Sequence, residues 1–386
     1  MKKYIVGSVL ILGLTVITLA IAAFKPQYRL VQAPAPSFIK AWGTQGAGNG
    51  QFNTPSGVAI DSSGDVYVID AGTGNGRIQK FNSDGVYQAQ WQCGEPEGIA
   101  IDNKNRIIVV LPGMMNVYDT SGSGALYASM ALKVGLSENM FLSKKEFASS
   151  ACVAAGPGLD IFVTTNHFVL KCNSFNSIIS TWGGEWNRGG HPAGPSGKGL
   201  FDNIEGIAVD LNGTVYVVDA GNYRVQKFNS NGKHLGQWGS KGDGPTEFGH
   251  PKGIAVDESG YVYVTDMVYN RITKFDSDGK FITRWGKEGT GNGEFKGPAS
   301  IAVRDGVIYV ADMYNHRIQK FQFLVVSTPP KEVKKIPVKS PEPQPPAPTS
   351  TTTLSPVIEP KAPDEQLTPT TSTVLTTTTT RQIRRF

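Results

Sequence analysis

The chain has 386 residues, with 37 Lys and Arg against 32 Asp and Glu, and a formal net charge of +5. The excess of positive charge is confined to the two ends: residues 1–37 carry +4 and residues 327–386 carry +3, which leaves −2 for residues 38–326. A nucleic-acid-binding surface needs concentrated positive charge, so this balance disfavours a nucleic-acid reader, and we expect no nucleic-acid partner.

The N-terminal segment, residues 1–37, contains an uncharged apolar stretch. Residues 4–24 are long enough to cross the hydrocarbon core of a membrane as a helix. Two interpretations stay open: an uncleaved transmembrane anchor, which the length favours, and a cleaved signal peptide, which the small residues at 20–22 would suit. In both cases we expect the remainder of the chain outside the cytoplasm, membrane-anchored or secreted.

Six related segments tile residues 38–326. The clearest copies are 55–91, 204–239 and 251–286, each a run such as "IEGIAVDLNGTVYVVDAGNYRVQKFNSNGKHLGQWG". The last copy, 298–323, stops before its final strand, and an equivalent of that strand, residues 38–43, precedes the first copy. Self-similarity on this scale is typical of one repeat architecture rather than of six domains.

Each copy predicts four short strands, because β-branched and aromatic runs alternate with turn residues. In the fourth copy we expect strands at 207–210, 215–219, 225–228 and 234–238. A single four-stranded sheet buries one face poorly, whereas six packed around an axis share a core. The sequence therefore predicts an all-β fold: a six-bladed β-propeller, closed by pairing 38–43 with 317–323.

Two copies are weak, and the propeller is followed by a tail. The second copy, 96–119, is expected to lose its usual third strand, and the third, 151–183, keeps mainly the hydrophobic rhythm. Residues 327–386 are rich in Pro and Thr with almost no aromatic residues, so we expect this tail to be disordered.

The pattern Gly-[Ile/Val]-Ala-[Val/Ile]-Asp, then Val-Tyr-Val-x-Asp-x-x-Asn-x-Arg-[Ile/Val]-x-Lys-Phe, resembles the NHL-repeat family of six-bladed propellers across residues 38–326. That resemblance implies the architecture and leaves the activity open. The family includes extracytoplasmic sensor domains, RNA-binding domains and a zinc-dependent peptide amidating lyase, and function depends on sites grafted onto a fold.

Strand direction sorts the loops into two faces. The second-to-third hairpins and the blade-to-blade loops are long and varied, and they should emerge together on what we call the long-loop face; the remaining turns define the short-turn face. Binding residues concentrate on loops held by a rigid scaffold. Candidate binding residues on the long-loop face are His167, Trp186, Arg188, His191, Tyr223, Tyr269, Tyr314 and His316.

An Asp-x-x-Asn-x-Arg element recurs at the second-to-third hairpin. We interpret it as structural, with Asp and Arg bracing the hairpin and Asn suited to a residue of positive φ. Its members are Asp219, Asn222, Arg224, Asp266, Asn270, Arg271, Asp312, Asn315 and Arg317, with a stretched version at Asp70, Asn75 and Arg77.

Four histidines predicted on the long-loop face raise the question of a metal site. Neutral imidazoles converging from separate blades bind zinc, and the amidating-lyase relatives use such histidines. The candidates here are His167, His191, His250 and His316, but only the His-Pro pairs at 191–192 and 250–251 share a context. We therefore expect no metal and no other cofactor.

Two insertions add to the long-loop face. Residues 183–201 carry Trp186 beside Arg188, a composition that interface hot spots favour; the alternative is that Trp186 covers the weak third blade. Residues 133–150 would suit a short helix. The glycine strings at 43–52 and 286–295 lead into no helix and no Lys-Ser/Thr, so they do not predict a phosphate site.

Three cysteines, Cys93, Cys152 and Cys172, are expected to be free thiols. The favoured function is a monomeric, extracytoplasmic propeller that binds a protein, peptide or glycan through its long-loop face without catalysis. The alternative is a metal-dependent lyase or hydrolase on the same scaffold.

Overall fold

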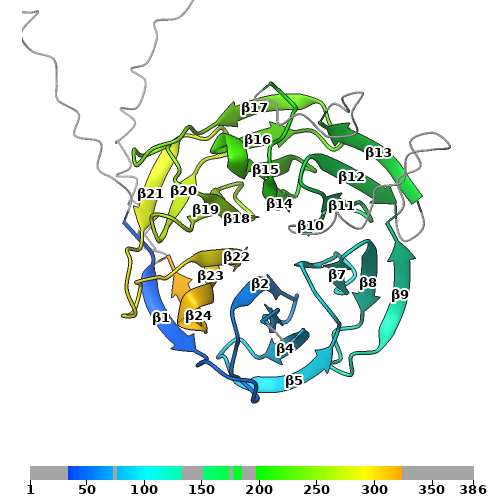
Figure 1. Ribbon diagram of the computed structural model, residues 1–386, viewed down its shortest axis with the longest axis vertical. Helices are drawn as coiled ribbons and strands as arrows, with labels where there is room; N and C mark the ends of the chain where they lie inside the picture. The colour runs from blue at the N-terminus through cyan, green and yellow to red at the C-terminus, as the bar shows by residue number, and fades with distance from the viewer. Residues whose placement is uncertain (1–33, 73–75, 133–150, 174–176, 185–196, 324–386) are drawn as a thin grey trace, which may run out of the picture. The chain divides into compact units, whose positions relative to one another are not determined.

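A computed structural model of the chain describes residues 34–72, 76–132, 151–173, 177–184 and 197–323. These residues form six four-stranded antiparallel sheets arranged as blades around an axis (Figure 1). The predicted all-β six-bladed propeller is thereby confirmed. The helices among these residues are two 3-10 turns, neither of which could cross a membrane; the predicted span 4–24 and the tail 327–386 lie outside the described residues.

The blades run in sequence order, and the first strand of each lies innermost. Blade 1 holds β2 (Pro55–Ile60), β3 (Val66–Asp70), β4 (Arg77–Phe81) and β5 (Tyr87–Gln92); blade 2 holds β6 (Gly98–Ile101), β7 (Ile107–Leu111), β8 (Met114–Tyr118) and β9 (Leu126–Ala131); blade 3 holds β10 (Val153–Ala155), β11 (Ile161–Thr164), β12 (Phe168–Asn173) and β13 (Ser177–Gly183). Blade 4 holds β14 (Ile204–Val209), β15 (Val215–Asp219), β16 (Arg224–Phe228) and β17 (His234–Trp238); blade 5 holds β18 (Pro251–Val256), β19 (Val262–Asp266), β20 (Arg271–Phe275) and β21 (Phe281–Trp285); blade 6 holds β22 (Pro298–Arg304), β23 (Val307–Asp312), β24 (Arg317–Gln322) and β1 (Ser37–Trp42).

The ring closes by pairing the two ends of the propeller. Strand β1 runs antiparallel to β24, with Phe38 opposite Phe321, and the two strands lie side by side in Figure 1. The rings of Phe38 and Phe321 meet edge to face at 5.8 Å between centroids. The predicted closure by residues 38–43 is confirmed.

Blade 2 corrects the expectation that the second copy lacks its third strand. Strand β8 pairs with β7 and β9 over its whole length, although it has no Arg or Lys-Phe. Met115 and Val117 keep the alternation of a strand and are almost completely buried. The usual long hairpin is reduced to Pro112-Gly113, which explains why the motif around it is absent.

Hydrophobic clusters bridge every pair of neighbouring blades. Along β3, for example, Val66 and Val68 pack with Tyr309 of blade 6, whereas Tyr67 packs with Ile107 of blade 2. Successive side chains of a strand point to opposite faces of its sheet, so each blade supplies apolar side chains to two clusters. The core is consequently a ring of six inter-blade layers rather than six separate cores.

At four of the six blade boundaries, a tryptophan near the end of the fourth strand fits one blade to the next. Its indole lies against a glycine in the third-to-fourth turn of the following blade, in the pairs Trp42–Gly85, Trp91–Gly124, Trp182–Gly232 and Trp238–Gly279. These glycines have positive φ, 83° at Gly279, and a Cβ there would meet the ring. Glycine is thus required for two reasons: the backbone has positive φ, and the tryptophan of the preceding blade leaves no room for a Cβ.

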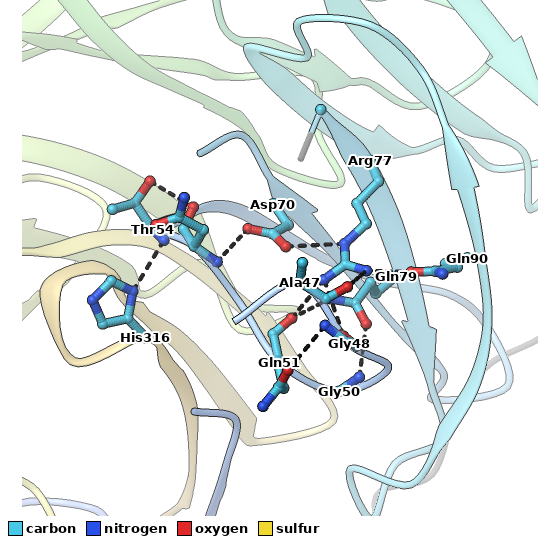
Figure 2. Close-up of polar contacts among 12 residues, drawn as sticks. Ala47, Gly48, Gly50, Gln51, Thr54, Asp70, Arg77, Gln79, Gln90 and His316 are labelled. Atoms are coloured by element: carbon cyan, nitrogen blue, oxygen red, sulfur yellow. Dashed lines mark hydrogen bonds and ion pairs between the residues drawn. The ribbon is translucent and has the colours of Figure 1, made fainter. Parts of the chain in front are cut away.

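Buried Asp–Arg pairs fix the long-loop face, and Figure 2 shows the one in blade 1. Arg77 donates to Asp70 at 3.0 Å and also to the backbone carbonyls of Ala47 and Gln51 at 2.7 and 2.9 Å. Asp70 in turn accepts from the backbone N–H of Asn53 at 2.7 Å. The pair therefore binds the second-to-third hairpin to the glycine-rich blade-to-blade loop, and the two loop sets share a face as predicted.

The same arrangement recurs in blades 4 and 6. Arg224 reaches Asp219 at 2.7 Å and the carbonyl of Leu200 at 2.9 Å. Arg317 reaches Asp312 at 2.8 Å and three loop carbonyls, those of Thr290, Gly291 and Glu294, at 2.7–2.8 Å. In blade 5, Arg271 instead pairs with Asp243 of the loop, and Asp266 lies 3.9 Å away.

Replacing Gly279 or Gly260 by Ala separates backbone strain from blade packing. Both glycines have φ near +80°, but a Cβ at Gly260 has open space whereas one at Gly279 meets Trp238. We expect Gly260→Ala to cost about 1 kcal/mol and Gly279→Ala about 2 kcal/mol more, by urea unfolding. Equal losses would contradict the proposed packing role of Trp238.

Replacing Arg317 by Lys tests whether the planar guanidinium is needed to join Asp312 to the carbonyls of the blade-to-blade loop. Lysine keeps the charge but cannot reach Asp312 and three carbonyls together, so we expect a loss of about 2–3 kcal/mol in unfolding free energy. The matched control is Arg304→Lys, a half-buried arginine whose Nε lies 3.7 Å from the carboxylate of Asp305 on the short-turn face, with an expected change within about 0.5 kcal/mol. Similar values for the two variants would show that the charge alone matters.

Candidate functional site

At the hairpin tips, the residue with positive φ is not always the asparagine that the sequence predicts. The residue immediately before the arginine has positive φ, 55° at Tyr223, 49° at Asn270 and 53° at His316. The expectation therefore holds for Asn270 but is wrong for Asn222 and Asn315, which donate their side-chain amides to the aspartate of their own hairpin. A short 3-10 turn places these two asparagines one residue too early. Asn75 lies outside the described residues.

The three candidate tyrosines all lie at hairpin tips but are not equivalent. Tyr223 is half-buried beneath Lys241, whose Nζ is 5.3 Å from the ring centroid, and Tyr269 is half-buried against Arg271 at 4.7 Å. Tyr314 is 51% exposed. The tyrosine precedes the arginine by one, two and three residues respectively, so only Tyr314 projects freely into solvent.

An apolar ridge crosses the tips of blades 5 and 6. It consists of Met267, Val268, Met313 and Tyr314, and Val268 is 58% exposed. The ring of Tyr314 lies over Gly297 next to Met267, which joins the two tips. Because Arg271 and Arg317 bind these hairpins to the neighbouring blade-to-blade loops, the ridge is held on a rigid base.

The candidate histidines have separate partners. His167 Nδ1 lies 3.1 Å from the carbonyl oxygen of Phe201, His250 Nε2 lies 3.1 Å from Glu205, and His316 Nδ1 accepts from the backbone N–H of Thr54 at 3.2 Å (Figure 2). Among the residues that the structure describes, no three His, Cys, Asp or Glu side chains are grouped as metal ligands. The fourth metal candidate, His191, is outside those residues, as are Trp186, Arg188 and the expected helix at 133–150.

A cavity of about 280 Å³ lies between the six innermost strands. Met313, from a hairpin of the long-loop face, is among its lining residues, so the cavity opens on that face. Glycines allow the inner strands of neighbouring blades to approach one another closely. A Cβ at Gly253, for example, would lie 2.8 Å from the carbonyl oxygen of Ala299. Deeper, the lining is aliphatic, with Val58, Ile99, Val153, Ile207, Ile254 and Ile301.

Three charged residues line the cavity, and two of them pair. Glu205 accepts from Lys252 Nζ at 2.7 Å and Asn203 Nδ2 at 2.8 Å, and it contacts His250 at 3.1 Å. Burial by itself would raise the pKa of Glu205, but the hydrogen bonds from His250 and Lys252 outweigh it and lower the pKa to about 2. The same hydrogen bond to Glu205 outweighs burial and raises the pKa of His250.

The third charged residue, Glu97, has no such compensation. Its Oε2 accepts one hydrogen bond, from the backbone N–H of Ala151 at 3.1 Å. Burial, with a smaller contribution from Glu95, raises its pKa to about 7, against the opposing effect of that hydrogen bond. Beside it in the lining lies Ser56, whose buried hydroxyl has no hydrogen-bond partner among the described residues.

The cysteines are free, and one lines the cavity. Cys93 and Cys172 are buried, and Cys152 is partly exposed. Burial raises the pKa of Cys152 to about 11, and Lys252 opposes this shift. A thiol so far from ionising at neutral pH is a poor nucleophile, so the cavity geometry suits binding through Glu97 better than covalent chemistry.

Sequence reasoning did not identify Glu97, Glu205 or Lys252. Each occupies the position immediately before the glycine slot of its inner strand, and in the six copies that position reads Ser, Glu, Ala, Glu, Lys and Ala. A chemically variable position next to a slot that is glycine in four of the six copies was the available signal. The side chains at this variable position line the axial cavity, whereas the more constant positions of the repeat pack within and between the blades.

Comparison with known families and structures agrees with this architecture. The NHL repeat matches residues 52–81 and 295–321, and a family described as a 6-bladed beta-propeller matches residues 198–276. No curated protein matches the chain.

Solved structures resemble it in fold. A protein of unknown function from Bacteroides thetaiotaomicron VPI-5482 is 16% identical with a TM-score of 0.51, covering 75% of this chain and 76% of that one. A gluconolactonase from Xanthomonas campestris is 15% identical (TM-score 0.47; 75% and 98% covered), and a streptogramin B lyase is 15% identical (0.45; 69% and 78%). The chain is a six-bladed β-propeller, and two of its segments match the NHL repeat.

Proposed function

We propose that this protein is an extracytoplasmic binding module, membrane-anchored or secreted, that holds a protein, peptide or glycan on its long-loop face and catalyses no reaction. The observation that carries the proposal is the apolar ridge. Val268 and Tyr314 expose more than half of their surface on neighbouring hairpins. Apolar side chains exposed on neighbouring hairpins with a rigid base are typical of interaction surfaces.

A polypeptide is the ligand class that the ridge favours. Val268 and the methionines offer aliphatic surface, and the flexible thioethers adapt to varied apolar partners. Tyr314 adds a rigid aromatic with a polar hydroxyl, a residue type enriched in interface hot spots. The net charge of −2 over residues 38–326 gives no support to a nucleic-acid ligand.

The position of the chain ends fits a tethered receptor. Ser37, at the start of β1, is opposite Gln322, near the end of β24, so the described chain enters and leaves the propeller together (Figure 1). Since β1 is a fourth strand, its start belongs to the short-turn face. An anchor at residues 4–24 would thus attach on the side opposite the ridge and leave the ridge accessible.

Selection of random peptides on the full-length protein tests the proposal. We expect peptides to be enriched whose affinity falls at least tenfold with the double variant Val268→Ser/Tyr314→Ser, because the ridge loses its apolar surface. The matched control is Val86→Ser/Leu211→Ser on the short-turn face, where the two side chains are 57% and 70% exposed. Its affinity should stay within twofold of the wild type.

Two outcomes would contradict the proposal. One is a failure to enrich any peptide on the wild-type protein. The other is enrichment of peptides that lose affinity with the short-turn control but tolerate the ridge variant, since binding would then depend on the wrong face. Both variants alter only exposed side chains, so their folding should match that of the wild type.

A further inference from the structure

The axial cavity contains an unbalanced charge. Its lining includes two carboxylates, Glu97 and Glu205, and one ammonium, Lys252. Glu205 is already neutralised, because Lys252 and His250 both contact it. Among the described residues no cation pairs with Glu97, whose one hydrogen-bond partner is the N–H of Ala151. The lining therefore holds one negative charge that the protein itself leaves uncompensated.

We propose that the cavity binds a primary ammonium group on an alkyl stem, with Glu97 as its counter-ion. The inference rests on the proposed function and extends it: the ligand on the ridge would be a polypeptide that inserts a lysine side chain into the mouth of the cavity. Met313 belongs both to the ridge and to the cavity lining, so the two surfaces are continuous.

The chemistry of the lining suits this group. An ammonium has three donors and no acceptor. Glu97 offers a carboxylate that accepts only one hydrogen bond from the described residues. Met313, which lines the mouth of the cavity, offers apolar surface to the methylene stem. A cavity of about 280 Å³ is large enough for one extended side chain but not for a folded peptide.

A bound metal ion fits these residues less well than an organic cation. The described part of the chain offers no group of three His, Cys, Asp or Glu side chains around the cavity. Metal ions in proteins bind through several such ligands at once. A single uncompensated carboxylate instead suits an organic cation such as an ammonium.

The protonation of Glu97 gives the site a predictable pH dependence. The groups that face it are Glu95 on its own segment, Cys152 on blade 3, and the Glu205, Lys252 and His250 cluster of blades 4 and 5. With a pKa of about 7, Glu97 is largely ionised at pH 8 and largely neutral at pH 5.5. A cation should therefore bind more weakly as the pH falls.

The experiment measures binding of Nα-acetyl-lysine N-methylamide to the full-length protein by ligand-observed NMR at pH 8. We expect saturable binding, with at least tenfold weaker binding of the acetyl-norleucine analogue, which keeps the stem without the charge. Glu97→Gln should weaken lysine-amide binding at least tenfold. The matched control is Glu95→Gln, an exposed carboxylate two residues away, which should change binding less than twofold.

The pH profile distinguishes Glu97 from His250. Wild-type affinity should fall about tenfold between pH 8 and pH 5.5, and His250→Gln should keep most of that fall. Glu97→Gln should abolish it. Equal binding of the two probes, or a Glu97→Gln variant with wild-type affinity and pH profile, would overturn the inference. Preference for acetyl-arginine N-methylamide over the lysine probe would reject the ammonium assignment.

A ligand-free measurement checks the state of Glu97 and the folding of its variant. Because the folded pKa is raised above 4.5, the stability that protonation contributes is present below pH 4.5 and is lost as the pH rises through 7. Glu97→Gln should therefore raise the unfolding midpoint at pH 8 and leave it unchanged at pH 4. A midpoint lowered at pH 8 would contradict the buried, uncompensated charge.

The outcomes for the two proposals can be told apart. If the lysine probe fails to bind while selected peptides still depend on Val268 and Tyr314, the cavity inference fails and the binding function stands. If the probe binds but no peptide depends on the ridge, the proposed function fails instead.

Discussion

The sharing of every hydrophobic layer between two blades is the constraint on which the rest of this structure depends. A blade alone would expose half of its apolar side chains, since Val66 and Tyr67, neighbours on one strand, pack against different blades. Six layers then require six boundaries, and the last boundary exists only if the ring closes. Strand β1 is therefore more than an extra strand, because its pairing with β24 completes blade 6 between blades 5 and 1.

The closing seam shows how the repeat adapts where chain connectivity is broken. In blades 1, 4 and 6 a lysine on the third strand donates to a carbonyl in the following blade's third-to-fourth turn, as Lys80 does to Thr120 at 2.8 Å. Blade 6 has no such turn, because its fourth strand comes from the N-terminus. Phe323 occupies part of the space that this turn fills in other blades. The centroid of its ring lies 6.1 Å from that of Trp285 and 4.2 Å from the ammonium of Lys274. Burial lowers the pKa of Lys274, which has rings where its equivalents have carbonyls.

Features that recur in most copies, such as the strand positions, could be predicted from the sequence. Features particular to one copy could not. Strands 215–219 and 234–238 were located to the residue, because turn glycines bracket each alternating run. Strand β8 was missed, since the prediction relied on the motif Lys-Phe rather than on burial at Met115 and Val117. The conformation of Asn222 was also misjudged, because a turn one residue longer or shorter assigns positive φ to a different side chain.

The candidate site escaped prediction for a geometric reason. Glu205 and Lys252 are 47 residues apart, and their contact follows from equivalent positions on adjacent inner strands that converge at the axis. Equivalence by repeat therefore predicts contact between neighbouring blades, but only after the ring and its order are known. Where copies agree, a residue serves the ring, as the arginines that begin the third strand do in blades 1, 4, 5 and 6 and the slot glycines do in blades 1, 2, 4 and 5. Where the copies differ at an axial position, as at Ser56, Glu97 and Lys252, the symmetry of the repeat is broken in the lining of the cavity, and that asymmetry gives the cavity its chemical identity.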